Sequence, residues 1–213
     1  MADPIIYGAA YSTYVRTVRM ALQEKGVAYQ LVEVDLFTGQ SQTPEHLARQ
    51  PFGKIPAFEH DGFALYETSA IVRYIDDVFA EPPLQPSDPR HRARMMQIIA
   101  INDNYAYAAL IGTILIQRVI QPKMGGTPDE EAIKAAVPVG RKAFREIDRL
   151  LGDQTFLAGE TLSLADLAII PVYDYALATP EGLEIVDGVP GLQRWWSKVS
   201  TRPCVVDTRP SLG

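Results

Sequence analysis

Cysteine and histidine are scarce in this chain. It has one cysteine, Cys204, and three histidines, His46, His60 and His91. A single cysteine excludes a disulfide framework within the chain, and so few nitrogen and sulfur ligands exclude a zinc cluster of the Cys/His type. We therefore expect no bound metal and a reducing compartment. The scattered histidines are expected to be ordinary surface or helix-capping residues.

The chain also lacks a basic excess, a long apolar run and a leader-like first segment. Its formal net charge of −6 argues against a nucleic-acid partner. The longest apolar run, residues 105–116, is shorter than the ~20 residues that span a bilayer, and polar residues flank it. The first residues have neither a basic region nor a long apolar stretch. We therefore expect no secretory signal, no membrane partner and a cytoplasmic location.

The first eighty residues alternate between strand-like and helix-like segments. Apolar strand candidates at residues 5–7 and 29–34 enclose a helix that starts after Ser12. A hairpin with the turn residues 60–62 then precedes another helix that ends near Phe79. A helix between two strands implies a parallel crossover, and the hairpin implies an antiparallel pair. The pattern predicts an α/β domain over residues 1–80 with a mixed four-stranded sheet.

A change of character follows this region. Residues 81–89 include four prolines, which indicates a stiff linker. Beyond it the patterns are helical, beginning with a long apolar helix over residues 91–122. Ser163-Leu-Ala-Asp166 has the pattern of a capping box, so we assign Asp166 to structure and not to catalysis. The sequence predicts an all-α domain over residues 90–213.

One stretch of the first domain combines a Gly-Pro loop, the hairpin and a polar helix start. The loop Pro51-Phe52-Gly53-Lys54-Ile55-Pro56 ends in an X-Pro bond, a type of bond that is compatible with a cis peptide. Glu67 and Thr68 open the helix after the hairpin. A helix start offers unpaired N–H groups and the positive end of the helix dipole, which suit a carboxylate ligand.

This string resembles the glutathione-binding segment of the glutathione S-transferases, in which Asn-Pro-x-Gly-x-x-Pro is followed by a strand pair and Glu-Ser. Gln50 stands at the Asn position and Thr68 at the Ser position, and both keep hydrogen-bonding capacity. The resemblance runs from about Ile5 to Phe79 and is closest to the serine-dependent, phi- and theta-like classes. It implies a thioredoxin-like first domain with a cis bond at Pro56, followed by a C-terminal helical bundle.

The resemblance makes Ser12 the catalytic candidate. Ser12-Thr13-x-x-Arg16-x-Val18 resembles the active-site stretch of phi-like transferases, in which the serine donates a hydrogen bond to the glutathione sulfur. Serine is also a preferred N-cap, and one hydroxyl can accept from the backbone and donate to sulfur. Tyr7 is the alternative catalytic residue, because the tyrosine-dependent classes place their phenol at the end of the first strand.

The resemblance also implies which residues hold glutathione. Glu67 and Thr68 take its γ-glutamyl end, and Ile55 pairs main chain to main chain with the cysteinyl unit beside Pro56. Lys54 meets the glycyl carboxylate, although a solvated loop lysine is an equally good interpretation.

Two further glutathione contacts are implied. One departs from the family pattern in its residues, and the other has an alternative interpretation. Ser41 and Gln42 align with a His-Lys pair that binds the glycyl end in phi-like relatives, so the anion contact there is weaker. Asp103 matches the acidic residue that several classes send across the dimer interface toward the γ-glutamyl group. The alternative is a charge on a polar turn with Asn102 and Asn104.

The function implied by the resemblance is that of a homodimeric cytoplasmic glutathione S-transferase, with glutathione as co-substrate and no metal. It conjugates the Ser12-activated thiolate to small hydrophobic electrophiles in detoxification-type chemistry, with peroxidase or dehalogenase reactions as variants. Tyr11, Tyr107 and Ile111 are candidates for the electrophile pocket from their positions alone. The alternative is a non-catalytic glutathione-fold protein that binds ligands or partners. A disulfide reductase is excluded because the chain has no Cys-x-x-Cys.

Overall fold

The computed structural model describes residues 2–79 and 81–210. The chain forms two compact units. The first runs to Pro83 and takes in the chain again from Arg202, and the second is Leu84–Thr201. The first unit is α/β and the second is built of helices, as the sequence predicts.

The first unit is organised around a four-stranded sheet. Its strands are β1 (Ile5–Tyr7), β2 (Gln30–Val32), β3 (Ala57–His60) and β4 (Phe63–Tyr66), in the order β2-β1-β3-β4. β1 pairs with β2 in parallel, while β1–β3 and β3–β4 are antiparallel. The predicted mixed sheet is therefore confirmed, although β2 is shorter than the predicted strand at residues 29–34.

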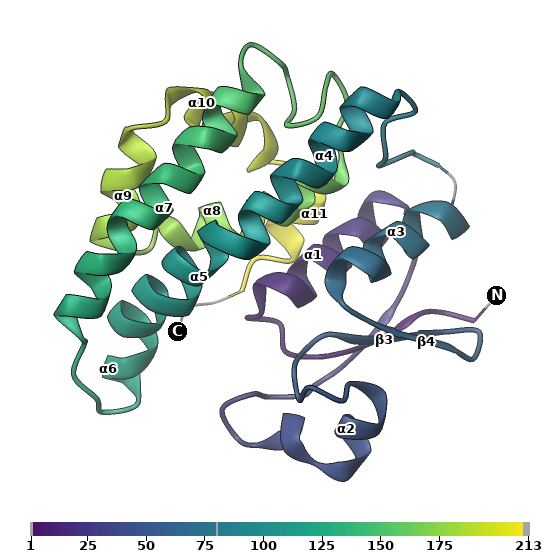
Figure 1. Cartoon of the computed structure of the whole chain (residues 1–213). Coiled ribbons are helices and arrows are strands. Elements are labelled where there is room, and N and C mark those ends of the chain that lie inside the picture. The colour runs from purple at the N-terminus through teal and green to yellow at the C-terminus, as the bar shows by residue number, and fades with distance from the viewer. Residues whose placement is uncertain (1, 80, 211–213) are drawn as a thin grey trace. The chain divides into compact units, whose positions relative to one another are not determined.

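Helices cover both faces of this sheet (Figure 1). α1 (Thr13–Glu24) and α3 (Thr68–Val78) lie on one face, and α2 (Pro44–Arg49) lies on the other. The period-two pattern of the strands explains this arrangement, because alternate side chains point to opposite faces. A short 3₁₀ turn, η1 (Gln40–Gln42), precedes α2.

The C-terminal segment belongs to this unit, through α11 (Pro203–Asp207). Arg16 of α1 is 1% exposed, and its guanidinium donates to the Val205 carbonyl oxygen at 3.1 Å and to Thr208 Oγ1 at 3.3 Å. Arg202 donates twice to the Glu24 carboxylate, at 3.0 and 2.7 Å. These partners lie far apart in the sequence, so the sequence patterns showed no sign of the contacts. The prediction therefore placed this segment in the all-α domain of residues 90–213.

The second unit is organised around one continuous helix, Pro89–Lys123. It comprises α4 (Pro89–Ile101), α5 (Tyr107–Ala109) and α6 (Gln121–Lys123), with π-helical sections η2 (Asn102–Ala106) and η3 (Leu110–Ile120) between them. By length and composition alone this helix could cross a membrane, but half of its most apolar stretch is buried inside the protein, as in a core helix.

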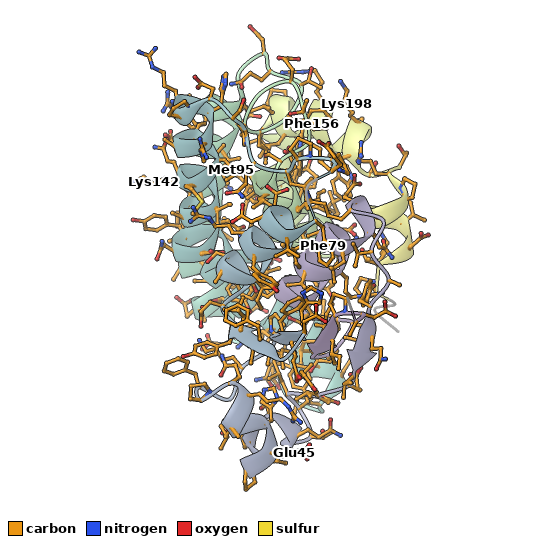
Figure 2. All side chains as sticks on the ribbon, turned by 90° about the vertical axis from the view of Figure 1, so that its right-hand side faces the viewer. Glu45, Phe79, Met95, Lys142, Phe156 and Lys198 are labelled. Carbon is orange, nitrogen blue, oxygen red and sulfur yellow. The ribbon has the colours of Figure 1, made fainter. Side chains whose placement is uncertain are left out.

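Four further helices complete the second unit. These are α7 (Glu130–Leu151), α8 (Leu164–Ala176), α9 (Pro180–Asp187) and α10 (Pro190–Val199). The sequence did not predict α9 as a separate helix. At the surface of this unit, the ammonium of Lys198 lies 5.8 Å from the centroid of the Phe156 ring, and Figure 2 shows the two side chains near each other.

Asp166 fixes the start of α8 from inside the second unit. Its side chain is fully buried, and it accepts hydrogen bonds from Leu157 N at 2.9 Å, Ser163 N at 2.8 Å, Ser163 Oγ at 2.7 Å and Trp195 Nε1 at 2.8 Å. Burial raises the pKa of the Asp166 carboxyl, and the four donors oppose that shift. The predicted capping box forms. Its hydrogen bonds are buried, which agrees with a structural role for Asp166.

Candidate active site

Ser12 is the N-cap of α1. Its backbone is extended, with φ −70° and ψ 129°, and its hydroxyl oxygen accepts from Val15 N at 3.4 Å. Among the described residues no acceptor takes the hydroxyl hydrogen, and the residue is partly exposed. Ser12 therefore combines a cap with an O–H group that remains available to a ligand at the positive end of a helix.

Tyr7, the alternative catalytic residue, is engaged on the other side of the sheet. Its hydroxyl donates to Glu59 Oε2 at 3.4 Å, and the Arg49 guanidinium of α2 lies 4.3 Å from the centroid of its ring. α2 covers the face opposite to α1. The Tyr7 phenol therefore contacts Glu59 and Arg49 on the α2 side of the sheet, and not the start of α1.

The close approach of α1 and the residue 51–56 loop depends on Gly8. A Cβ at Gly8 would lie 2.5 Å from Val15 Cγ2 and 3.3 Å from Ile55 Cβ. Only a residue without a side chain allows both neighbours to pack against this point of the chain. Val15 and Ile55 are buried there, which brings the first turn of α1 and the loop together.

Ile55 presents unpaired main-chain groups next to a cis peptide bond. The Ile55–Pro56 bond is cis, as the resemblance implies. Neither the N–H nor the carbonyl of Ile55 has a main-chain partner among the described residues, although β3 begins only two residues later. An extended peptide can pair with such groups as an additional strand does.

Side chains around α2 hold this loop in place. Gln50 Oε1 accepts from Phe52 N at 2.7 Å and from Lys54 N at 3.2 Å. His46 Nε2 lies 2.7 Å from the Lys54 carbonyl oxygen, where it donates. Gly53 takes a positive φ of 61°, which favours glycine. The Lys54 side chain itself is exposed.

Ser41 and Gln42 are part of the same support. Ser41 is 2% exposed. Gln42 Nε2 donates to Ser41 Oγ and to the Gly53 carbonyl oxygen, both at 3.3 Å. Their polar groups thus stabilise the loop, and contact with the glycyl end of a ligand stays a prediction for both residues.

Glu67 and Thr68 lie where β4 leads into α3. Ala57 pairs with Tyr66, so the start of α3 is next to the cis-proline end of the loop. Glu67 has a positive φ of 71°, a strained conformation for this residue, and no side chain among the described residues caps the helix. Ala70 N donates to the Glu67 carbonyl oxygen at 3.0 Å, and within the described part of the chain the N–H groups of Thr68 and Ser69 have no main-chain acceptor, so they remain available at the positive end of the helix dipole.

The remaining predicted site residues are divided between the two units, Tyr11 in the first and Asp103, Tyr107 and Ile111 in the second. Tyr11 precedes Ser12, and its hydroxyl donates to Asp35 Oδ1 at 2.9 Å. In the second unit, Asp103 is exposed on η2 and accepts from Asn102 Nδ2 at 3.1 Å. Tyr107 is partly buried, and burial raises the pKa of its phenol, while Ile111 is buried. The roles assigned to these residues stay predictions.

The prediction that all three histidines are surface or cap residues is wrong for two of them. His46 and His60 are each 2% exposed, and only His91, in the first turn of α4, is exposed. His60 Nδ1 contacts the Tyr74 hydroxyl at 2.9 Å. Strand alternation was the missed signal for His60, which shares a sheet face with Phe58. His46 has no comparable signal, because it is buried by the loop and not by a periodic face.

Comparison with known proteins agrees with the geometry of both units. Family models described as the N-terminal and C-terminal domains of glutathione S-transferase match residues 6–83 and 107–203. Glutathione S-transferase 1 of Zea mays is 32% identical over 96% of this chain and 95% of its own length. Probable glutathione S-transferase GSTF1 of Oryza sativa subsp. japonica is 32% identical over 94% and 92%.

Solved structures give the same result. Glutathione transferase F7 from Populus trichocarpa matches with a TM-score of 0.86 and 31% identity, over 96% of this chain and 97% of that one. A structure of glutathione S-transferase I from Mais in complex with an atrazine glutathione conjugate matches with a TM-score of 0.85 and 32% identity, over 97% and 96%. The thioredoxin-like first domain and the helical second domain are those of these neighbours.

Proposed function

Because the chain belongs to the glutathione S-transferase family of transferase enzymes, we propose that it binds glutathione in its first unit and activates the glutathione thiol through Ser12. The thiolate sulfur then forms a C–S bond at the carbon of a small apolar electrophile, and the leaving group departs with the bonding electrons. The thiol proton is released to solvent. The observation that supports this most is Ser12, which caps α1 and keeps its O–H free of acceptors among the described residues.

The energy that this activation requires matches what the site offers. Lowering a thiol pKa from ~8.5 by about two units needs ~2.7 kcal/mol of preferential thiolate stabilisation. A hydrogen bond to a charged group contributes ~1.5–3 kcal/mol, and a helix N-terminus contributes ~0.3–1 kcal/mol. The Ser12 hydroxyl and the start of α1 together are sufficient without a general base.

Glutathione is proposed to lie along the edge formed by the loop and the start of α3. Ile55 pairs with the cysteinyl unit through its unpaired main-chain groups, beside cis-Pro56. The α-carboxylate of the γ-glutamyl end accepts from the Thr68 hydroxyl and the N–H groups of the first turn of α3, while Glu67 faces the ammonium. Lys54, which is exposed, is the cation for the glycyl carboxylate.

Further proposed contacts are secondary to these. Ser41 and Gln42 act at the glycyl end chiefly through the loop that they support. Asp103 is proposed to reach the γ-glutamyl group of a second copy. Tyr107 and Ile111 are proposed to hold the electrophile, together with Tyr11.

The enzyme is proposed to be a cytoplasmic homodimer. Each unit carries an exposed apolar surface that a second copy would cover. In the second unit a cavity of about 290 Å³ lies between η2 and α7, and its apolar lining includes Tyr105 and Val139, which are 57% and 44% exposed. In the first unit the rings of Phe52 and Tyr66 meet edge to face, with centroids 6.0 Å apart, and both are exposed.

A titration of the bound thiol tests the proposal. Thiolate absorbance of glutathione bound to the full chain is followed against pH, for the wild type and for Ser12→Ala. We expect a bound-thiol pKa well below the free value in the wild type only. Glutathione bound with an unshifted thiol would instead identify a binding protein without catalysis, and equal pKa values in both proteins would remove Ser12 from the mechanism.

A further inference from the structure

A polar cavity lies in the first unit at the C-terminal end of α1. α11 packs against α1, and residues 178 apart in the sequence, Glu24 and Arg202, meet at the cavity wall. The cavity has a volume of about 400 Å³, and its lining consists of Gln23, Glu24, Arg202, Pro203, Cys204 and Asp207. None of these residues belongs to the proposed glutathione or electrophile site, so the cavity is a separate feature of the unit.

Arg202, the cation among the lining residues, is already neutralised. Its Nε and Nη2 donate to the two Glu24 carboxylate oxygens at 3.0 and 2.7 Å. Burial raises the pKa of the Glu24 carboxyl, but hydrogen bonds from Arg202 and Cys204 bring that pKa below its ordinary value, so Glu24 is charged at neutral pH. Burial also raises the pKa of the Cys204 thiol, which therefore stays neutral. An anionic ligand would find no free positive charge among these groups.

Two acceptors of the cavity remain unused. Gln23 Oε1 is buried and has no hydrogen-bond partner among the described residues. Asp207 is exposed, and its carboxylate has no hydrogen-bond or ion-pair partner within the same part of the chain. A buried acceptor without a partner is destabilising, and a donor from a ligand would remove that penalty.

The end of α1 also favours a cation at this place. The last carbonyl groups of a helix form the negative end of its dipole, which attracts positive charge. α1 has no basic side chain in its last turn. Its C-cap residue, Lys25, is buried in an ion pair with Asp76, at a distance of 2.5 Å between Nζ and Oδ1. A positively charged ligand in the cavity would therefore lie at a helix end that lacks a free cation of its own.

We propose that this cavity binds a small aliphatic amine, whose ammonium group donates to Gln23 Oε1 and to the Asp207 carboxylate. An ammonium has three N–H donors and no acceptor, which suits a site with two unused acceptors. The alkyl part of the ligand lies against Pro203. The site is at the opposite end of α1 from Ser12, and it does not rest on the proposed function.

Three compounds of matched chain length test the selection for a cation. These are 1,4-diaminobutane, 1,4-butanediol and succinate, which are cationic, neutral and anionic at neutral pH. Binding to the folded full chain is measured by isothermal titration calorimetry at low salt. We expect one equivalent of the diamine to bind, and the diol and succinate to bind at least about tenfold more weakly.

Two variants with matched controls locate the bound amine. Gln23→Leu removes the buried acceptor and keeps much of the side-chain volume, so it should raise the Kd of the diamine about tenfold or more. Asp207→Asn keeps the shape and removes an exposed, solvent-screened charge, so it should raise that Kd about two- to fivefold. Gln30→Leu and Asp3→Asn make the same changes at other exposed positions of the first unit and should leave the Kd unchanged. Urea unfolding checks that each variant is folded, and Asp207→Asn, at an exposed position, carries the test if Gln23→Leu does not fold.

The outcomes decide the proposal without reference to catalysis. Selective binding of the diamine that is weakened by a cavity variant, and not by its control, supports the amine site. Absence of diamine binding, equal binding of the diol, or tighter binding of succinate overturns it. Diamine binding that is unchanged in Gln23→Leu and Asp207→Asn, or equally weakened in Asp3→Asn, also overturns it. Such binding would reflect only the general attraction of a cation to a chain with a net charge of −6.

Discussion

Ser12 and Ser163 are both serine N-caps, one in each unit, and they differ in where the hydroxyl hydrogen goes. Ser163 is 1% exposed, and its Oγ donates to Asp166 at 2.7 Å. Ser12 is partly exposed, and no acceptor among the described residues takes its hydrogen. The same local motif thus gives a closed structural cap in one place and an open hydrogen-bond donor in the other. Only an open donor is available to activate a ligand.

The largest expected effect breaks the structural cap. Asp166→Ala leaves the buried donors Leu157 N and Trp195 Nε1 without a partner. We expect a loss of about 3–5 kcal/mol in the free energy of unfolding, the range for removing one partner from a buried charged group. Urea unfolding measures it, with the exposed Asp153→Ala as control. A loss below ~1 kcal/mol would show that the carboxylate is not the centre of this network.

The next effect breaks the open cap. Ser12→Ala removes the donor to sulfur, so kcat/KM for conjugation should fall about 10- to 100-fold, the equivalent of a hydrogen bond to a charged group. The free energy of unfolding should fall by only about 0.5–2 kcal/mol, as for other N-caps. Steady-state kinetics on the folded variant measures the first quantity. Retained turnover would contradict the comparison, since the two serines would then differ in exposure only.

Ser163→Ala sharpens the comparison from the other side. It removes one of the four bonds to Asp166 and no group of the proposed site. We expect a loss of about 1–2 kcal/mol in the free energy of unfolding, with kcat/KM per folded molecule unchanged. Equilibrium unfolding and kinetics at a temperature well below the transition give both values. A fall in kcat/KM that matches Ser12→Ala would mean that any lost N-cap disturbs activity.

The smallest expected effect is on the KM for glutathione and concerns Lys54, whose contact with the ligand is a prediction. Lys54 is exposed, so its attraction to the glycyl carboxylate is screened by solvent. Lys54→Ala should raise the KM for glutathione about two- to fivefold without changing unfolding. Lys134→Ala, at an exposed position on α7, is the control. An unchanged KM for glutathione would leave Lys54 as the solvated loop lysine of the alternative interpretation.

Much of the first unit follows from sequence patterns that act over a few residues. The strand Ile5–Tyr7, the helix start after Ser12 and the hairpin were predicted close to their observed bounds. Their signals are local, namely alternation, caps and turn residues. The loop supports are different. His46 and Gln42 reach residues 51–54 from a segment that only the folded chain brings near, so their positions in the sequence carried no sign of this role.

By itself the sequence determined the order of elements, the mixed sheet and the two serine caps, because each depends on residues close together in the chain. The cis bond at Pro56 was implied by the family resemblance. The tertiary structure alone decided which hydroxyl stays open, which histidines are buried, and that the segment from Arg202 joins α1. It also decided that Asp35 meets the Tyr11 hydroxyl. Burial and the pairing of polar groups are set by neighbours distant in sequence, and those neighbours are known only once the chain has folded.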